Sequence, residues 1–316
     1  MTSPLAPLSE DAYRALRGDV TAWSPLVEDV LDRHDLREAE AEIVGGHNPT
    51  YPTFVVGDVV VKFFGFVPTW RMTHAAERAA MTMLLRDPQI RAPRLLATGE
   101  LREDAHAPWP YLVISRIPGR SIEDTTLTDA QRGALAWELG EQLKRVHTLP
   151  PSDAMQAIAW DPVDLSSALA RSSLPPHLIE QASDYVSAIP AAAPCFLHGD
   201  LAGQHVFVER KTFRGFIDWG DAVVADPHLE LIQLYRGTFD CDGALFDACL
   251  EAYGWPRDET FPTRTLGHAL LRQALGLAQH LGMDVFEPIA AKHDLARLPT
   301  LDAMAALLFE ADATRA

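Results

Sequence analysis

The sequence predicts an α+β protein of two lobes, with a small antiparallel sheet and a helix in the N-terminal lobe and a larger, mainly helical C-terminal lobe. The chain has 316 residues, which is enough for two lobes that each bury a core. Its first third is rich in short β-like runs between turn residues, whereas the chain after Thr128 is mostly patterned at helical spacing. We expect the N-terminal lobe at residues 1–115, a hinge at 116–119 and the C-terminal lobe at 120–316.

The first third is predicted to contain strands and one helix. The runs Phe54–Val56 and Val59–Phe64 flank a Gly-Asp dipeptide, which is typical of a β-hairpin. The stretch His74–Leu85 is rich in Ala, Met and Leu at helical spacing and ends before a proline. Two more strands are expected at Arg94–Ala97 and Tyr111–Ile117, and the second is followed by a Pro-Gly turn.

The rest of the chain is predicted to be mainly helical, with one short hairpin. The helix expected at Asp129–His147 carries leucines at positions 135, 139 and 143 on one face. Two β-like runs, Val206–Val208 and Phe213–Ile217, are joined by residues 209–212 and interrupt the helical pattern. From Pro227 onward the sequence predicts helices again.

The composition excludes several classes of protein. Hydrophobic residues make up 47% of the sequence and charged residues 22%, as in ordinary globular proteins. Acidic residues outnumber basic ones by 44 to 27, and the formal net charge of −17 repels nucleic acid phosphates, so we expect no nucleic acid partner. Two interpretations of the charge stay open. Part of it lines a cleft and attracts a cationic ligand, or it only maintains solubility.

The sequence also lacks targeting and cross-linking signals. No apolar run approaches the roughly 18 residues that a membrane span needs, and Met1–Asp11 lacks the basic and apolar stretches of a secretory signal. The three cysteines form no C-x-x-C pair, and their odd number argues against a disulfide framework. We therefore expect a cytoplasmic protein with no membrane partner, and we expect a monomer.

The densest functional signal lies around the predicted hairpin. The run Leu197–Leu201, with the sequence LHGDL, precedes the hairpin, and Ile217–Asp218 ends it. The two carboxylates, Asp200 and Asp218, are thus expected at the ends of short strands joined by the hairpin, facing one cleft. Phosphoryl transfer needs such a pair, because one carboxylate positions and deprotonates the attacking hydroxyl while the other holds magnesium at the phosphates. We assign Asp200 the first role and Asp218 the second.

Three short motifs carry a resemblance to a known family. His198–Asp200, Ile217–Asp218 and Ala225–Pro227 have the order and spacing of the aminoglycoside phosphotransferase family, which this sequence resembles. The resemblance implies a protein-kinase-like fold of two lobes, ATP or GTP as the phosphate donor and Mg²⁺ as a cofactor. It also implies that His198 and Asp200 belong to the catalytic loop, and that the aspartate of the third motif braces this loop.

One position departs from the pattern of the family. Most members carry a magnesium-binding Asn five residues after the catalytic Asp, whereas this sequence has His205, as in the macrolide kinases of the same superfamily. A neutral imidazole can bind metals, but magnesium prefers oxygen. Three interpretations stay open. His205 contributes to the metal site with Asp218, directly or through water, or it contacts phosphate directly when protonated. In the third, it is a structural histidine, and Asp218 and the phosphates hold the ion.

A nucleotide site is expected in the N-terminal lobe. Lys62 alternates with apolar residues in a predicted strand, where an unpaired ammonium would be costly, so it needs an anionic partner. Glu77 on the following helix is the expected partner, as in the Lys-Glu pair of kinase-like folds; the alternative is a solvated lysine on an edge strand. A loop at residues 45–50, which includes Asn48, is expected to cover the phosphates. Adenine is expected to bind main-chain groups at the end of the lobe's last strand, at Ser115, Arg116 and Ile117.

The N-terminal lobe also carries a resemblance that concerns the substrate. Its segments run in the same order as in the hygromycin B phosphotransferases of the family, and the matching segments are Asp11–Tyr13, Leu16–Arg17, Trp23, Asn48–Pro49, Val61–Gly65, Pro93–Leu96 and Trp109–Val113. This resemblance implies an ATP-dependent O-phosphotransferase that acts on a hydroxyl of an aminoglycoside or aminocyclitol antibiotic, such as hygromycin B, and confers resistance.

Such a substrate is polycationic, so carboxylates and aromatic rings are expected at its site. Asp221 and Trp219 follow Asp218 directly and are the residues expected to bind the substrate. Two other functions stay open, namely a kinase for a macrolide or another small-molecule alcohol, which the histidine after the catalytic loop favours, and a nucleotide-binding pseudokinase. Further acidic residues that are available, although each also fits an exposed helix surface, are Glu230, Asp240, Asp242, Asp284 and Glu287.

Overall fold

The computed structural model of the chain describes residues 5, 9–38, 40–47, 49–102, 106–156, 163–190, 192–275 and 282–310. The chain divides into two compact units. The N-terminal unit comprises Met1–Arg86 and Ala92–Ile117, and the C-terminal unit comprises Asp87–Arg91 and Pro118–Ala316.

The short segment Asp87–Arg91 belongs to the C-terminal unit because its backbone bonds there. The Arg91 N–H donates to Gln142 Oε1 at 2.8 Å, and the Arg91 carbonyl accepts from the Phe216 N–H at 2.9 Å. The sequence places this segment in the N-terminal lobe, between a helix and a strand, and nothing in its composition indicates where its backbone bonds.

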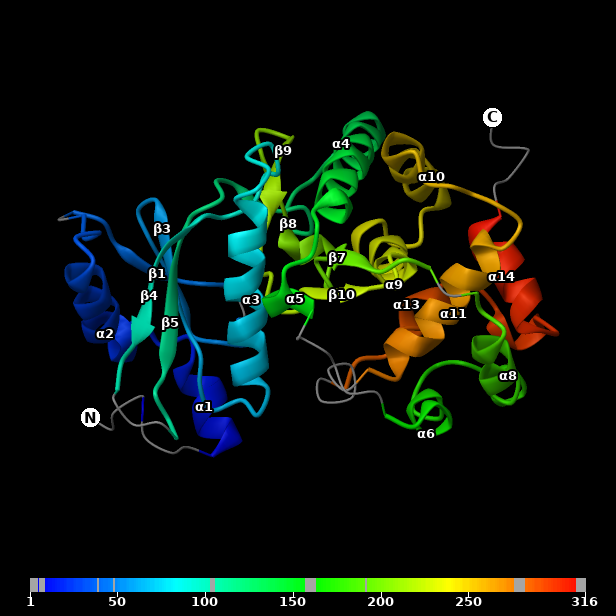
Figure 1. Cartoon of the computed structure of the whole chain (residues 1–316), viewed down its shortest axis with the longest axis horizontal. Coiled ribbons are helices and arrows are strands. Elements are labelled where there is room, and N and C mark those ends of the chain that lie inside the picture. Colours follow the sequence, from blue (N-terminus) through cyan, green and yellow to red (C-terminus); the bar gives the residue numbers. More distant parts are fainter. Residues whose placement is uncertain are drawn as a thin grey trace. The chain divides into compact units, whose positions relative to one another are not determined.

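The N-terminal unit is built on an antiparallel sheet. In the described part of this unit, five strands pair in the order β1-β2-β3-β5-β4 (Figure 1). β2 at Thr53–Val56 and β3 at Val59–Phe63 form the predicted hairpin. Gly57 in its turn has a φ of +55°, which glycine adopts without steric cost. The other strands are β1 at Ile43–Gly45, β4 at Leu95–Glu100 and β5 at Pro110–Ser115.

The prediction of one helix in this part of the chain was wrong. α1 at Glu10–Leu16 and α2 at Val20–Arg33 precede the sheet, and the predicted helix is α3, which begins one turn earlier, at Trp70–Leu84. In Figure 1 the sheet lies between α2 and α3. The signal for α2 is an N-capping aspartate, Asp19, followed by apolar residues at helical spacing. Those that α2 buries are Trp23, Val27, Val30 and Leu31.

The C-terminal unit contains two small sheets that frame the predicted catalytic segment. β7 at Cys195–Leu197 pairs with β10 at Val223–Ala225, and β8 at Val206–Glu209 pairs with β9 at Thr212–Phe216. The predicted β8–β9 hairpin is confirmed, but the expected link between the two carboxylates is corrected. Asp218 follows the hairpin, whereas Asp200 follows β7, which belongs to the other sheet. Among the described residues of this unit, the remaining strand is β6 at Arg120–Ser121, which pairs with β8.

Helices make up most of the rest of this unit. α4 at Asp129–Thr148 confirms the long predicted helix, and Thr128 and Gln131 form a capping box at its start. α9 at His228–Gln233 continues into a π-helical turn, η2, at Leu234–Thr238. In the described part of this unit, the other helices are α5 at Asp153–Gln156, α6 at Leu165–Leu169, α7 at Pro176–Ile179, α8 at Ala182–Ser187, η1 at Gly203–His205, α10 at Gly243–Tyr253, α11 at Phe261–Gln273, α13 at Glu287–Ala290, η3 at Leu295–Arg297 and α14 at Leu301–Phe309.

Among the helices of the described residues, none is both long enough and apolar enough to cross a membrane.

Candidate active site

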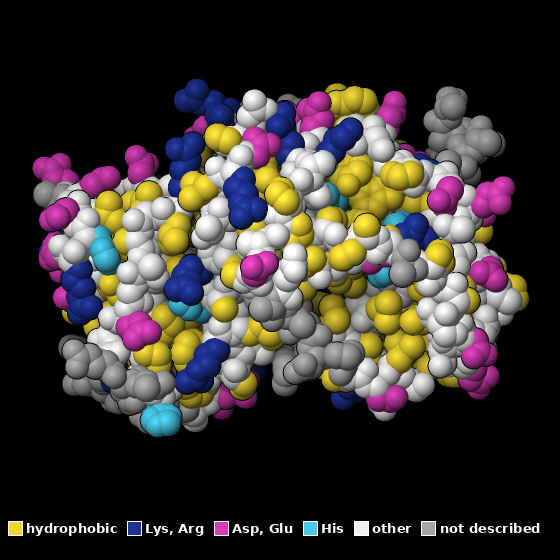
Figure 2. All heavy atoms as spheres, in the orientation of Figure 1, with side chains coloured by type: hydrophobic (Ala, Val, Ile, Leu, Met, Phe, Trp, Pro, Cys, Tyr) yellow, Lys and Arg dark blue, Asp and Glu magenta, His cyan; other side chains and the backbone are white. Residues whose placement is uncertain are grey.

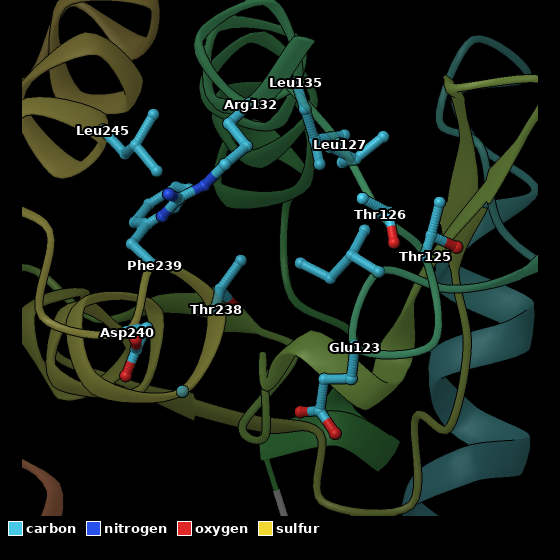
Figure 3. A pocket seen from close by; sticks show the side chains of 12 residues that line it. Glu123, Thr125, Thr126, Leu127, Arg132, Leu135, Thr238, Phe239, Asp240 and Leu245 are labelled. Atoms are coloured by element: carbon cyan, nitrogen blue, oxygen red, sulfur yellow. The ribbon is translucent and has the colours of Figure 1, made fainter. Parts of the chain in front are cut away.

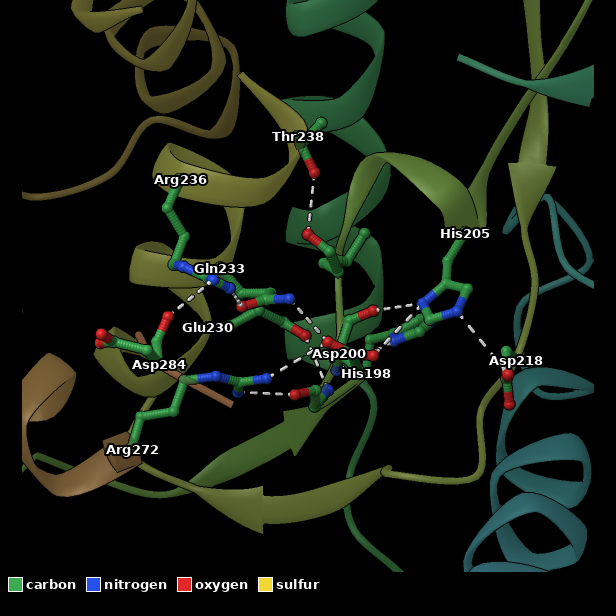
Figure 4. A network of polar contacts seen from close by, with 12 residues as sticks. His198, Asp200, His205, Asp218, Glu230, Gln233, Arg236, Thr238, Arg272 and Asp284 are labelled. Atoms are coloured by element: carbon green, nitrogen blue, oxygen red, sulfur yellow. Dashed lines mark hydrogen bonds and ion pairs between the residues drawn. The ribbon is translucent and has the colours of Figure 1, made fainter. Parts of the chain in front are cut away.

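Asp200 lies in the loop after β7, and side chains from two helices hold its carboxylate (Figure 4). Its Oδ1 accepts hydrogen bonds from Gln233 Nε2 at 2.7 Å and from Arg272 Nη2 at 3.3 Å. Its Oδ2 faces His205 Nδ1 at 3.6 Å, and among the described residues no group donates a hydrogen bond to Oδ2. Only 9% of the residue is exposed, so the two donors fix its orientation and leave Oδ2 as the oxygen that can accept from a ligand.

The backbone of the same loop is fixed at Gly199. This residue has a φ of +86°, and a Cβ added to it would lie 2.0 Å from the backbone oxygen of Asp221, so only glycine fits. Its N–H donates to Glu230 Oε1 at 2.9 Å, and its carbonyl accepts from Arg272 Nη1 at 2.7 Å. Arg272 therefore holds the loop at two adjacent points, the Gly199 carbonyl and the Asp200 carboxylate.

Glu230 of α9 is buried, and its expected availability to a substrate is corrected. It is 0% exposed, and its Oε2 accepts a hydrogen bond from His147 Nε2 of α4 at 2.8 Å. Burial by itself raises the pKa of Glu230, but the hydrogen bond and charge of His147, together with His198 and the Gly199 N–H, outweigh burial and lower it. The ionised carboxylate thus connects the catalytic loop to α4.

His198, expected to be catalytic, is buried beneath the catalytic loop and bonded to its backbone. Its ring is fully buried and packs on the Trp219 ring at 4.4 Å between centroids. Its Nε2 donates to the Ile217 carbonyl at 2.9 Å, and its Nδ1 accepts from the Asp200 N–H at 3.3 Å. Burial lowers its pKa, which favours the neutral ring that these two bonds require. The ring fixes the Asp200 loop relative to the residue before Asp218.

Asp218 differs from Asp200 in its exposure and its backbone. Its side chain is 45% exposed, and its φ of +62° is uncommon for a residue other than glycine. The Ile217 N–H before it donates to the His205 carbonyl at 3.0 Å, which ties this segment to η1. Backbone strain of this kind is found at functional sites, where the surrounding structure holds it in place. The carboxylate of Asp218 is accessible to a ligand.

His205 lies between the two carboxylates, as Figure 4 shows. Its Nδ1 donates to the Asp200 carbonyl at 2.8 Å, and its Nε2 is 3.6 Å from Asp218 Oδ2. Burial by itself lowers its pKa, but the carboxylates of Asp200 and Asp218 outweigh burial and raise it. Magnesium prefers oxygen ligands, and the accessible Asp218 carboxylate offers them. The position of His205 between the two aspartates, with Nδ1 committed to the Asp200 carbonyl, suits a link between them.

The two residues expected to bind substrate, Asp221 and Trp219, occupy different environments. The Trp219 ring is 0% exposed and stacks on Phe196 at 5.7 Å between centroids, so it offers no surface to a sugar. Asp221 lies near the other carboxylates. Its pKa is raised, because burial and the charges of Asp200 and Asp218 disfavour its ionised form. Trp219 is a core residue beneath the catalytic loop, and Asp221 stays a candidate for substrate binding.

Asp226 braces the end of β10 by several contacts. Its Oδ1 accepts from both the backbone N–H of His228 at 2.9 Å and the His228 Nδ1 at 2.8 Å. Its Oδ2 lies 3.5 Å from both Arg264 Nη2 and His268 Nε2, and accepts from the Ala192 N–H at 3.3 Å. These contacts join β10, α9 and α11, which suits the structural role implied for this residue.

Lys62 and Glu77 form a direct ion pair in the N-terminal unit. Lys62 Nζ of β3 lies 2.7 Å from Glu77 Oε2 of α3, and the two side chains are 8% and 1% exposed. The Lys62 ammonium also lies 5.4 Å from the centre of the Phe64 ring, within cation–π range. The structure thus brings together the two residues that the sequence pairs; their role toward a nucleotide stays a prediction.

The main chain at the end of β5 is partly committed to other bonds. The N–H groups of Ser115 and Arg116 donate to the carbonyls of Arg94 and Asp58, each at 2.8 Å. Among the described residues, no backbone acceptor is bonded to the N–H of Ile117. Adenine would therefore find a free main-chain donor at Ile117, whereas the donors of Ser115 and Arg116 are taken. Asn48 lies outside the described residues.

Comparison with known families adds an independent observation. A family model described as the phosphotransferase enzyme family matches residues 45–264, more than half of the chain. The chain belongs to this family. The matched part contains the Lys62–Glu77 pair and the segment from Asp200 to Asp226, and Arg272 lies beyond it. The expectation of a phosphotransferase is thereby confirmed.

Two curated relatives match parts of this phosphotransferase. Viomycin phosphotransferase of Streptomyces vinaceus is 27% identical over 141 residues, which cover 40% of this chain and 49% of that protein. Lysine-specific demethylase JMJ21 of Arabidopsis thaliana is 23% identical over 206 residues, which cover 47% of this chain and 22% of that protein. The chain thus spans about half or less of the length of these relatives.

Solved structures resemble this phosphotransferase over most of its length. The GDP and kanamycin complex of APH(2″)-IIIa has a TM-score of 0.59 at 17% identity, and the match covers 85% of this chain and 99% of that chain. Macrolide 2′-phosphotransferase MphH from Brachybacterium faecium has a TM-score of 0.56 at 18% identity, and the match covers 91% of this chain and 99% of that chain. At these identities the likeness shows the fold alone. It confirms the predicted α+β, kinase-like fold.

The sequence did not identify two residues that hold Asp200 in this phosphotransferase. Gln233 ends α9, and Arg272 lies near the end of α11, where both are buried. The available signal for Arg272 was weak. An Arg-Gln pair directly follows an apolar Ala-Leu-Leu run inside a predicted helix, and a buried arginine requires an anionic partner.

The acidic side chains of this phosphotransferase do not gather in one place on the face shown in Figure 2. On the face shown in Figure 2, acidic side chains occur at several separate places, with basic side chains between some of them. On this face the surplus does not form one continuous patch.

Proposed function

We propose that this protein transfers a phosphoryl group from ATP or GTP to a hydroxyl of a cationic small-molecule antibiotic. The observation that carries the proposal is the Asp200 carboxylate, whose Oδ1 accepts from Gln233 and Arg272 while Oδ2 is left for a ligand. An acceptor hydroxyl that donates to Oδ2 is oriented by this bond. Its oxygen then bonds to the γ-phosphorus, the bond to the nucleoside diphosphate breaks, and the proton moves to Asp200.

The proposal assigns the metal to Asp218. This carboxylate is accessible and follows a segment that η1 and His198 fix in place. A magnesium ion bound there supplies positive charge that offsets the charge of the phosphates. We assign His205 the positioning of Asp200 and Asp218, since it donates to the Asp200 carbonyl and its Nε2 faces Asp218.

The nucleotide is assigned to the N-terminal unit. Lys62, oriented by Glu77, is proposed to contact the α- and β-phosphates, as its buried ion pair supports. The Ile117 N–H is proposed to donate to adenine, and Asn48 to belong to the loop over the phosphates. Because the reaction consumes a nucleotide, we place it in the cytoplasm. We also propose that a monomer carries it out.

The proposed acceptor is an aminoglycoside or aminocyclitol, with hygromycin B as the first candidate. The order of N-terminal segments that resembles the hygromycin B phosphotransferases supports this choice, and so does the acidic surplus. A macrolide is the second candidate, because His205 resembles the macrolide kinases and the fold resembles a macrolide 2′-phosphotransferase. Phosphorylation of the antibiotic would confer resistance.

The test is a screen for acceptor-dependent consumption of ATP and GTP by the purified protein with magnesium. The acceptors are hygromycin B, kanamycin, streptomycin, viomycin and a macrolide, and inactivation of each antibiotic is measured in parallel. We expect turnover with at least one aminoglycoside or aminocyclitol. If only the macrolide stimulates turnover, the second candidate holds. If none stimulates it while nucleotide still binds, the antibiotic-kinase proposal is wrong and a pseudokinase is favoured.

A further inference from the structure

A pocket of 360 Å³ lies within the C-terminal unit, beside the catalytic loop (Figure 3). Residues 122–127, the start of α4, the end of η2 and the start of α10 form its walls. Leu127 and Leu135 contribute apolar surface on one side, and Phe239 and Leu245 contribute it on another. The reaction assigned to Asp200 does not use this pocket.

The pocket shares a wall with the catalytic loop. Thr238, which lines it, donates from Oγ1 to the Leu201 carbonyl at 2.8 Å, one residue after Asp200. On the same side, a Cβ added to Gly203 would lie 3.1 Å from Glu123 Oε1, so the Glu123 carboxylate lies against the loop. Gly203 is three residues from Asp200, and three residues span at most roughly 11 Å. A molecule of several sugar rings can reach both places.

The pocket carries one uncompensated charge. Arg132 is paired with Asp242 at 3.4 Å, and Asp240 is paired with Lys292 at 2.7 Å, so these charges offset one another. In the part of the chain that the structure describes, Glu123 makes no ion pair or hydrogen bond, and its side chain is exposed. The net charge that a ligand meets in the pocket is therefore negative, and it favours a cation.

The hydroxyl groups in the pocket are arranged to accept hydrogen bonds. Thr125 donates its Oγ1 proton to the Ser121 carbonyl at 2.8 Å, and Thr238 donates its own to Leu201. Once the proton of a hydroxyl is committed, only its lone pairs remain for a ligand. Both threonines therefore favour a ligand that donates, such as an ammonium or a sugar hydroxyl. The apolar walls suit the less polar face of a sugar ring.

We propose that this pocket binds an amino-bearing ring of the acceptor, remote from the hydroxyl that receives phosphate, and that Glu123 pairs with its ammonium group. The inference rests on the proposed function, because it places one part of the acceptor at Asp200 and another in the pocket. Glu123 acts here as a specificity residue: it contributes to acceptor affinity and has no part in the transfer of the phosphoryl group.

The experiment compares Glu123→Gln and Thr126→Trp with the wild type. Glu123→Gln removes the charge, and Thr126→Trp, at an exposed position on the pocket wall, fills the space without disturbing a buried contact. The matched control is Glu259→Gln, which removes one exposed carboxylate of the same unit that does not line the pocket. Binding of kanamycin and hygromycin B is measured by calorimetry, with maltotriose as a sugar that lacks ammonium groups, and KM and kcat are measured for acceptor and nucleotide.

We expect Glu123→Gln to weaken binding of the amino sugars and raise their KM by about three- to tenfold, as for a partly exposed ion pair, with kcat and the KM of ATP unchanged. Thr126→Trp should weaken binding further, and Glu259→Gln should behave as the wild type. If binding depends on Glu123 but no acceptor is phosphorylated, the proposed function is wrong and the pocket assignment stands. The assignment is overturned if the amino sugars do not bind, if Glu123→Gln binds them as the wild type does, or if only the KM of ATP rises.

Discussion

Lys62 and Glu77 of the N-terminal unit meet from two consecutive elements 15 residues apart, whereas Asp200 of the C-terminal unit is held by side chains 33 and 72 residues away. In the first case a strand and the next helix are enough to build the site. In the second, the loop depends on α4, α9 and α11, and the carboxylate is placed by the packing of the whole unit. We infer that the fold keeps its stability when Lys62 and Glu77 are both replaced by apolar residues. We do not expect the same of the residues that hold Asp200.

The largest effect is expected from Asp200→Asn. An amide cannot accept the proton of the acceptor hydroxyl, so kcat should fall by roughly 10²- to 10⁴-fold while the Kd of the nucleotide changes little. Acceptor-dependent turnover and nucleotide binding are measured on the same preparation. Asp302→Asn, at an exposed position of α14, is the matched control and should retain activity. Full activity of Asp200→Asn would exclude it as the base.

The network itself is tested at Arg272. Arg272→Gln removes the donors to the Gly199 carbonyl and to Asp200 Oδ1, so kcat should fall by about 10- to 100-fold through misplacement of the carboxylate. Arg272→Lys keeps the charge and should recover part of kcat, whereas the KM of the nucleotide should not change in either variant. If kcat falls equally in both variants, and thermal unfolding shows that both have lost the same fraction of folded protein, Arg272 only stabilises the fold and does not position Asp200.

A smaller effect is expected at the ion pair of the N-terminal unit. Lys62→Met should raise the KM of ATP by about tenfold through loss of one phosphate contact, and should lower the unfolding free energy by about 3 kcal/mol because Glu77 is left buried without its partner. Lys62→Met combined with Glu77→Leu should recover the stability but not the KM. If the double variant recovers both the stability and the KM of ATP, the Lys62–Glu77 pair is purely structural and is not part of a nucleotide site.

The smallest effect is expected at Asp226. Burial by itself raises its pKa, but hydrogen bonds from the ring and backbone N–H of His228, with the charges of the nearby histidines, outweigh burial and lower it. A carboxyl with a lowered pKa stabilises the fold above its unfolded pKa of about 3.9, and this stability is lost as the pH falls below that value. Asp226→Asn should cost about 1 to 2 kcal/mol of unfolding free energy at pH 7.

Urea unfolding at a series of pH values checks both the sign and the window. The difference between wild type and Asp226→Asn should persist at pH 5 and should shrink as the pH falls below about 4. A difference that grows below pH 4 would contradict a carboxyl that is ionised in the fold.

The sequence was informative where a local pattern carries the chemistry. The HGD motif and the Ile-Asp pair identify Asp200 and Asp218, since both follow short β runs, and the alternation around Lys62 requires a nearby acid. The β2–β3 and β8–β9 hairpins were predicted for the same reason, because their strands and turns are neighbours in the chain. The two helices before the sheet were not predicted. α1 has only seven residues, and α2 contains Pro25, a residue that usually breaks or kinks a helix, although its apolar residues have helical spacing.

The residues that sequence reasoning missed or misplaced depend on distant packing. Gln233 and Arg272 are polar residues in helices, and nothing local distinguishes a buried polar residue there from a solvated one. Trp219 shows the opposite error. An aromatic next to the motif was expected to contact substrate, yet Phe196 and His198 cover its ring completely. The direction in which a side chain points just after a strand depends on how the surrounding sheets pack, which the local sequence does not show.

The most direct test of the proposed function is mass spectrometry of the acceptor itself. Hygromycin B and kanamycin are incubated with ATP, magnesium and either the wild-type protein or Asp200→Asn, and the masses of the antibiotics are measured. We expect one added phosphoryl group on at least one of them with the wild type, and unchanged antibiotic with Asp200→Asn. Unmodified antibiotics in every reaction, or equal modification by both proteins, would contradict the account.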